Sequence, residues 1–248
     1  GMYIVPLAIE VPPEAVQFER KGEKRSMRLE VLGILKAANR TLARLGGNFD
    51  VNLTDPEYAS IVSNKIYYRQ DLMLTPGEYT IELLVRDKQS GKISARREQL
   101  VLPEFEAEFA ATPLVLSRYV AAANPQPNEQ LNVFTTNKTS IRPSAALQFS
   151  QAHNLIMFLN LYNAANSPDT GKPMVRVTAR LMKDGKPATK PFDFVLTELD
   201  NEPVPHLNFA EYIKLNGMSA GRYTVAIEAK DMVTKKLLKQ EGSFEIKP

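Results

Sequence analysis

Few side chains in this sequence have the type and spacing that catalysis or metal binding requires. There is no cysteine, which excludes disulfides, thiolate catalysis and sulfur-ligated metals. The two histidines, His153 and His206, lie far apart, and a single His beside a strand is usually structural. No Gly-rich phosphate loop, nucleophile elbow, zinc helix or EF-hand pattern is present. We therefore predict that the chain is not an enzyme and has no catalytic residue, metal site or cofactor.

The acidic residues favour structural roles as well. Asp87 and Asp231 each follow a strand, and a turn-initiating Asp that hydrogen-bonds nearby backbone explains both without a metal. Glu104, Glu106 and Glu108 alternate along a proline-bounded segment. On an extended chain this spacing gives a charged face rather than an acid/base pair at working distance. We assign Asp87 and Asp231 to the structural framework.

Both aspartates belong to a repeat within the chain. Residues 74–87 align without a gap on residues 218–231, and the match continues to residues 102 and 246. A separation this long is the size of a domain and is too long for a solenoid repeat. The sequence therefore contains two copies of one module.

The repeated segment alternates apolar and polar residues with a period of two, which predicts a half-buried strand. The inward positions are Tyr79, Ile81, Leu83 and Val85 in the first copy and Tyr223, Val225, Ile227 and Ala229 in the second. A turn and a Gly-x-Tyr motif precede each strand, at Gly77 and Gly221. The motif resembles the tyrosine corner of sandwich domains, in which the Tyr hydroxyl returns to nearby backbone. Tyr79 and Tyr223, with their glycines, are predicted to be structural.

These strands are typical of the last two strands of an immunoglobulin-like sandwich. A length of 248 residues suits two domains, and 17 prolines with 44% hydrophobic residues suit strands joined by rigid turns. We predict an all-β fold of two tandem immunoglobulin-like or fibronectin-III-like β-sandwich domains, residues 1–104 and 105–248. The pattern leaves open whether the first domain includes its own first strand.

The remaining elements are placed around the repeats. The first domain is predicted to contain a strand at Tyr3–Val11, a hairpin of Met27–Lys36 with Thr41–Leu53, a short helix starting at Asp55, and a strand at Lys65–Leu74. The second is predicted to contain strands at Leu114–Val120, Leu155–Tyr162, Val175–Lys183, Phe192–Thr197 and His206–Leu215. Tyr68 and Tyr212 are expected at matching places.

Two irregular stretches attract attention. Residues 103–113 form a linker that we expect to bury Phe105 and Phe109 at the junction of the domains. Residues 121–146 form a connection of unusual length for a compact domain, and such loops are often functional. We regard the 121–146 loop as a candidate binding region.

Charge and hydropathy exclude several partner classes. The chain carries 31 basic and 28 acidic residues, so its net charge of +3 gives no electrostatic footprint for nucleic acid. The basic cluster at residues 20–25 reads as a solvated hairpin loop. No apolar run reaches the roughly 18 residues of a membrane helix, which predicts no membrane-spanning segment.

The repeat also carries a family resemblance. Residues 74–87, with Ser90-Gly91-Lys92 and residues 100–103, resemble a C-terminal region of von Willebrand factor A-related proteins found chiefly in acidobacteria. The similarity covers most of residues 2–120 and continues more weakly through residues 142–144, 155–163 and 181–187. Where the family often has Leu-Pro-Pro-Gly this chain has Leu-Thr-Pro-Gly at residues 74–77, and it lacks a second Gly at residues 93–94.

The resemblance implies an exported bacterial protein, secreted, periplasmic or at the cell surface. Its sandwiches would support or extend an adhesive A-type domain of the same polypeptide, which is the partner that the resemblance suggests. The Asp-x-Ser-x-Ser metal motif of A-type domains is absent from these residues, so no metal-dependent adhesion site carries over.

Two functional hypotheses follow. The first is a non-catalytic spacer and protein-interaction module, with contacts at the sheet edge nearest the start of the first domain. The alternative is a carbohydrate-binding accessory module, for which Tyr67, Tyr119 and Tyr162 would have to form the aromatic platform because there is no Trp.

Overall fold

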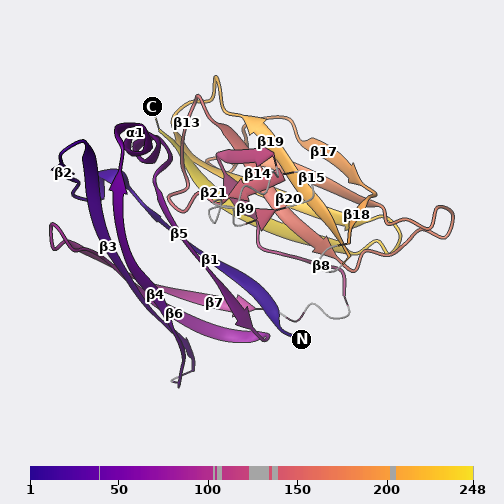
Figure 1. The fold of residues 1–248 in the computed structure, drawn as a ribbon. Helices are drawn as coiled ribbons and strands as arrows, with labels where there is room; N and C mark the ends of the chain where they lie inside the picture. Colours follow the sequence, from indigo (N-terminus) through magenta and orange to yellow (C-terminus); the bar gives the residue numbers. More distant parts are fainter. Residues whose placement is uncertain are drawn as a thin grey trace. The chain divides into compact units, whose positions relative to one another are not determined.

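The computed structural model describes residues 1–38, 40–102, 104, 108–122, 134–135, 139–201 and 205–247. The chain divides into two compact units, Gly1–Glu104 and Phe105–Pro248 (Figure 1). In the described residues nearly all regular structure is β-strand, arranged in antiparallel sheets, with α1 (Asp55–Asn64) and a short 3₁₀ turn, η1 (Pro13–Ala15), as the helical elements. The predicted all-β sandwich class is confirmed.

The first unit has a small sheet and a large one. The small sheet pairs β1 (Tyr3–Val11) antiparallel with β5 (Ile66–Leu74). The large sheet takes its strands in the order β4 (Arg40–Leu53), β3 (Lys24–Ala37), β6 (Gly77–Asp87) and β7 (Ile93–Leu102). A short strand, β2 (Glu19–Lys21), forms a hairpin with the start of β3 across the basic cluster.

The core of the first unit follows the alternation along β3 and β6. Leu29 and Leu35 of β3 are 3% and 2% exposed, and Leu35 packs in one cluster with Leu72 and Tyr79. At the start of α1 the backbone N–H of Thr54 donates to Glu57 Oε2 at 2.7 Å, which caps the helix. This bond and the hydroxyl bond of Thr54 hold the pKa of the Glu57 carboxyl below its usual value.

Gly46 marks an irregularity in the edge strand β4. Its φ is +109°, and a Cβ at this position would lie 2.0 Å from the carbonyl oxygen of Val31. Its N–H donates to Gln70 Oε1 at 3.1 Å, so this bond joins β4 to β5 of the opposite sheet. The edge strand is therefore fastened to the small sheet at one point where only glycine fits.

The second unit contains two larger sheets. One has the order β18 (Leu199–Asp200), β19 (His206–Lys214), β14 (Asn154–Tyr162) and β8 (Ala110–Ala111), with β9 (Val115–Ser117) also on β14. The other has the order β13 (Gln148–Ser150), β21 (Leu237–Lys247), β20 (Gly221–Asp231), β15 (Val175–Lys183) and β16 (Lys186–Pro187), with β17 (Phe192–Leu196) also on β15. Within the second sheet β13 pairs with β21 in parallel.

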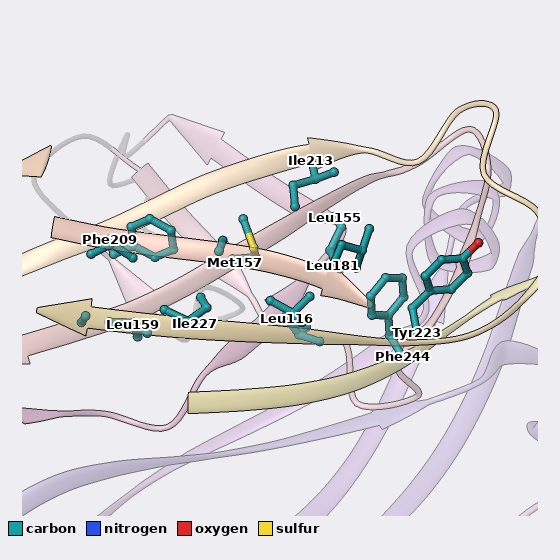
Figure 2. Packing of buried hydrophobic residues seen from close by; sticks show 14 of the residues in the cluster. Leu116, Leu155, Met157, Leu159, Leu181, Phe209, Ile213, Tyr223, Ile227 and Phe244 are labelled. Carbon is teal, nitrogen blue, oxygen red and sulfur yellow. The ribbon is translucent and has the colours of Figure 1, made fainter. Parts of the chain in front are cut away.

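The two sheets of the second unit enclose a closely packed core. Leu159, Leu181 and Phe209 are completely buried, and the Tyr223 ring stacks on Phe244 at a centroid distance of 5.6 Å (Figure 2). Strand β14 is buried on its outer face too, where Ile156 and Phe158 pack with the fully buried Ile141. Ile141 belongs to β12 (Thr139–Arg142), which pairs with β10 (Tyr119–Ala122) and β11 (Phe134–Thr135) in a third, small sheet.

The structure bears on two sequence expectations for the second unit. Leu114–Val120 does not form one strand, because the buried Ser117 hydroxyl donates to the Tyr119 carbonyl at 3.0 Å and breaks the chain into β9 and β10. Phe109, which the sequence predicts at the junction of the domains, is part of the core of the second unit, at 6% exposure. Phe105 lies outside the described residues.

The expected match of Tyr68 with Tyr212 is also wrong. The Tyr68 ring lies edge-on to Phe49 at 5.2 Å, on the inner face, whereas Tyr212 is 56% exposed. Residues 75–76 connect β5 to β6, but the longer segment 215–220 connects β19 to β20. The gapless alignment of the two copies therefore holds from β6 and β20 onward. It does not hold for the preceding strands, β5 and β19.

Replacing Gly46 by Ala should destabilise the first unit by on the order of 3 kcal/mol, because the new methyl group meets the Val31 carbonyl at a strained φ. Urea-induced unfolding would measure the loss. Gly47→Ala is the matched control, since its Cβ would meet only Phe49 at 3.9 Å. Equal stability of the two variants would contradict the fastening role of Gly46.

Candidate functional site

Asp87 ends β6 and is buried, with 3% of its surface exposed. Its carboxylate accepts hydrogen bonds from the backbone N–H groups of Gln17 at 2.9 Å and Gln89 at 3.0 Å. It also accepts a bond from the hydroxyl of Ser90. Gln17 lies between β1 and β3, so the carboxylate joins the β6–β7 turn to the segment that leads from one sheet to the other.

Asp231 does the same in the second unit and is fully buried. It accepts bonds from the N–H groups of Ala165 at 3.1 Å and Val233 at 2.8 Å, and from the Thr234 hydroxyl at 2.8 Å. Ala165 lies between β14 and β15, the connection that corresponds to the one holding Gln17. The carboxylates of the two aspartates therefore accept hydrogen bonds from matching turns.

The protonation of these carboxyls reflects their surroundings. Burial by itself raises the pKa of Asp87, but the bonds from Ser90, Gln17 and Gln89 outweigh it and hold the pKa below its usual value. For Asp231 burial is again opposed and outweighed, here by bonds from Ala165, Thr234 and Val233. Both groups are thus bound more strongly in the ionised form.

The two tyrosines form matching corners. The Tyr79 hydroxyl donates to the Thr75 carbonyl at 2.7 Å, and the Tyr223 hydroxyl donates to the Ser219 carbonyl at 2.8 Å. The preceding glycines have φ values of +152° at residue 77 and +138° at residue 221, which a side chain would strain. Each corner fixes the entry of the chain into β6 or β20.

The three tyrosines considered for a carbohydrate platform lie on three different strands. Tyr67 is on β5 of the first unit. In the second unit Tyr119 packs under the Arg142 guanidinium, 4.4 Å from its ring centroid, and follows β9. Tyr162 lies against His206 at the far end of β14. It is at least six strand residues, or about 20 Å, from the end of the β9-paired part of β14 that lies nearest to Tyr119. Within the second unit the structure therefore does not bring Tyr119 and Tyr162 into one platform.

The histidines are likewise separate. His153 Nδ1 accepts the Ser150 N–H at 3.0 Å, and His206 is 5% exposed beside Tyr162. Among the described residues no three or more His, Asp or Glu side chains gather as metal ligands would. Residues 123–133 and 136–138, most of the loop proposed as a binding region, lie outside the described residues.

An open strand edge distinguishes the first unit. Strand β1 pairs with β5 on one side, and within the described residues no strand pairs with its other edge. In the second unit β8 and β9 occupy the corresponding edge of β14. Most of β1 is uncharged; its single acidic residue, Glu10, pairs with Lys65 at 2.6 Å.

The inner face of β7 in the first unit is not covered in the way that the inner face of β21 is covered in the second. In the second unit a Cβ on Gly242 would meet Leu116 at 3.2 Å and Leu114 at 3.3 Å, so this position of β21 is covered by the segment around β9. The aligned residue of β7 is Glu98, which pairs with Ile81 and is exposed. If the first unit had a strand in the position that β9 occupies in the second unit, that strand would bury the Glu98 carboxylate.

Sequence reasoning missed one surface. On the outer face of β3 and β6, Leu32, Ile34 and Leu84 lie together, and Leu32 is 50% exposed. The signal was present in the sequence, because Leu84 breaks the alternation of its strand at an outward position.

No protein-family model and no curated protein matches the sequence. In the part of the chain that the structure describes, no helix combines the length and apolar character needed to cross a membrane.

Removing either corner hydroxyl should cost about 1 kcal/mol of unfolding free energy, because a buried bond to backbone is lost. Tyr79→Phe and Tyr223→Phe should behave alike in chemical unfolding, given bonds of 2.7 and 2.8 Å. Tyr212→Phe, at an exposed position, is the control and should change nothing. A cost for the control as large as for the corner variants would contradict this assignment.

The buried aspartates should make stability depend on acid pH. Because the folded pKa of Asp87 and Asp231 lies below the ordinary value of 3.8, their contribution is complete above about pH 5 and is lost as the pH falls through the folded pKa. Asp87→Asn or Asp231→Asn should lower the unfolding free energy at neutral pH by about 1 to 3 kcal/mol.

Unfolding measured between about pH 2 and pH 7 should show a flatter acid limb for both Asn variants. Asp169→Asn, at an exposed position, is the control and should keep the wild-type profile. An unchanged acid limb in both buried-site variants would show that these carboxylates do not carry the acid sensitivity.

Proposed function

We propose that the chain is a tandem of immunoglobulin-like sandwich modules that acts, without catalysis, as a spacer and a protein-interaction surface in an exported bacterial protein. The observation that carries the proposal is the pair of matching fasteners, a tyrosine corner and a buried aspartate, in both units. In each unit these groups hold the same strand hairpin, β6–β7 or β20–β21, to the neighbouring connection.

The strand orders support the immunoglobulin-like assignment. In the first unit β3, β6 and β7 are consecutive neighbours in one sheet, while β1 pairs with β5 in the other. In the second unit β15, β20 and β21 are consecutive neighbours, while β14 pairs with β19. The same chain order thus supplies the same two layers twice.

The chemistry of the described side chains also supports a non-catalytic role. The buried acids are satisfied by turn backbone, and the histidines lie in separate contacts. The near-balanced charge favours protein over nucleic acid as the partner. Export, and an A-type domain of the same polypeptide as partner, rest on the family resemblance alone.

The open edge of β1 is the interaction place that we propose for this function. A strand edge offers a row of backbone donors and acceptors, and addition of a partner strand is a common mode of recognition. The exposed Glu98 opposite this edge indicates that the first unit does not need a strand packed like β9. The edge is thus compatible with a partner that is not part of the permanent core.

Site-specific photocrosslinking tests the proposal. A benzophenone amino acid placed at Ile4, on β1 and 61% exposed, should yield a discrete protein adduct when the natural polypeptide is produced in its own bacterium and recovered from outside the cytoplasm. The same group at Leu237, 49% exposed on β21, is the control and should yield none.

Ala8→Lys, which places a charge on the outer side of β1, should abolish the Ile4 adduct while leaving the unfolding free energy unchanged within about 0.5 kcal/mol. Adducts with polysaccharide in place of protein would favour the carbohydrate-binding alternative. A cytoplasmic location, or equal adducts at Ile4 and Leu237, would refute the proposal.

A further inference from the structure

The outer face of the large sheet of the first unit carries an apolar patch, formed by Leu32, Ile34 and Leu84 and called here the apolar face. Leu32 pairs with Leu84 across β3 and β6, and Leu32 and Ile34 are 50% and 36% exposed. A shallow hollow of about 760 Å³ lies over these side chains and is also lined by Arg44, Glu82, Ala95 and Arg97. Four strands of this sheet, β4, β3, β6 and β7, contribute residues to its lining.

The fold does not require these apolar residues. The second unit has the same strand pairs, in which Thr178 faces Glu228 where the first unit has Leu32 facing Leu84. On the next strand, the residue paired with Glu228 in the second unit is Lys239, whereas the residue paired with Leu84 in the first unit is Ala95. A polar and charged face is therefore compatible with this sheet, and the apolar face is a property of the first unit.

The second unit shows how a solvated version of this face is stabilised. Glu228 accepts a hydrogen bond from Arg180 Nη1 at 2.6 Å and lies 3.7 Å from Lys239 Nζ. In the first unit the corresponding positions expose aliphatic carbon to water, and the hydrophobic effect favours covering them. A binding partner would supply that cover.

The charges around the apolar face select the partner. Glu82, the acidic residue of the hollow, is already engaged: Lys36 Nζ lies 2.6 Å from one carboxylate oxygen and Arg97 Nε 3.8 Å from the other. The hydrogen bond from Lys36 holds the pKa of Glu82 below its usual value, so this carboxylate stays ionised and paired. Arg44 is exposed and makes no ion pair in the described part of the chain.

We propose that the apolar face is a docking surface for an acidic protein segment. The segment would lay two or three aliphatic or aromatic side chains over Leu32, Ile34 and Leu84 and direct Asp or Glu carboxylates toward Arg44 and Arg97. This inference rests on the proposed protein-interaction function. It adds the surface of the first unit that would bind and the chemistry of the partner that would bind there. A protein fits better than a lipid surface, because the apolar side chains line a hollow that receives side chains and do not project to enter a bilayer.

Peptide selection tests this docking surface directly. A phage library of random dodecapeptides is panned against the full chain, and the enriched peptides are synthesised and titrated calorimetrically. We expect peptides that combine two or more large apolar residues with flanking Asp or Glu. The double variant Leu32→Thr/Leu84→Glu, which installs the residues of the second unit, should lower their affinity at least about tenfold.

Two further variants separate the apolar and charged contributions. Arg44→Glu should weaken binding several-fold and reduce its dependence on salt between about 50 and 500 mM. Val195→Thr is the control, because Val195 is an apolar residue of β17, 56% exposed, outside this surface; it should bind as the wild type does. If the double variant unfolds, the single variant Leu32→Thr replaces it.

Three results would overturn the proposal: no enriched peptide, enriched peptides that bind the double variant unchanged, or binding to phosphatidylglycerol vesicles that the double variant loses. The last would assign the surface to a membrane. These results are independent of the Ile4 crosslink. Loss of the crosslink with selection intact would refute only the β1 edge, and failed selection with an intact crosslink would refute only the apolar face.

Discussion

Each unit depends on one buried carboxylate at the end of a central strand. Asp87 and Asp231 are charged groups with almost no contact with solvent, and an unpaired charge there would be very costly. They are tolerated because turn N–H groups and a hydroxyl surround each of them. The same bonds hold a connection between the sheets against a hairpin, so the geometry of both layers follows from this one arrangement.

The two units share this framework but differ in how completely additional strands cover their sheets and cores. In the second unit β8 and β9 extend the sheet of β14, β13 extends the sheet of β21, and many core residues have no exposed surface. In the first unit a two-stranded sheet faces a five-stranded one, and charged residues occupy the inner face of β7. The second unit is therefore the more completely enclosed sandwich, and the first has the surfaces that a partner could cover.

The sequence predicted the repeated parts of the fold well, because they depend on local chemistry. Alternating side chains located β6 and β20, and the short helix expected to start at Asp55 is α1. The errors came from long-range effects. The segment expected as one strand, Leu114–Val120, is divided at Ser117, whose hydroxyl bonds to backbone, and a longer connection before β20 shifts the match of Tyr68 with Tyr212. The longer connection changes no periodicity, so this shift could not be seen in the pattern.

The candidate surfaces were harder to predict than the fold for a related reason. Leu84 appeared in the sequence as a single exception in a strand, and only the pairing of β3 with β6 places Leu32 beside it. Likewise, Glu98 indicates an uncovered inner face only by comparison with the aligned Gly242 of the second unit, which Leu114 and Leu116 cover. A surface is a property of several strands together, and one strand's pattern does not contain it.

The double-sided burial of β14 has a consequence for biosynthesis. Its residues 155–159 are five successive apolar side chains, a composition that favours intermolecular β-aggregation when exposed. The strand bearing Ile141, which packs on its outer face, and β9, which pairs with its edge, both precede it in the chain. On a ribosome they emerge first, so the protective layer is available before the vulnerable strand leaves the exit tunnel.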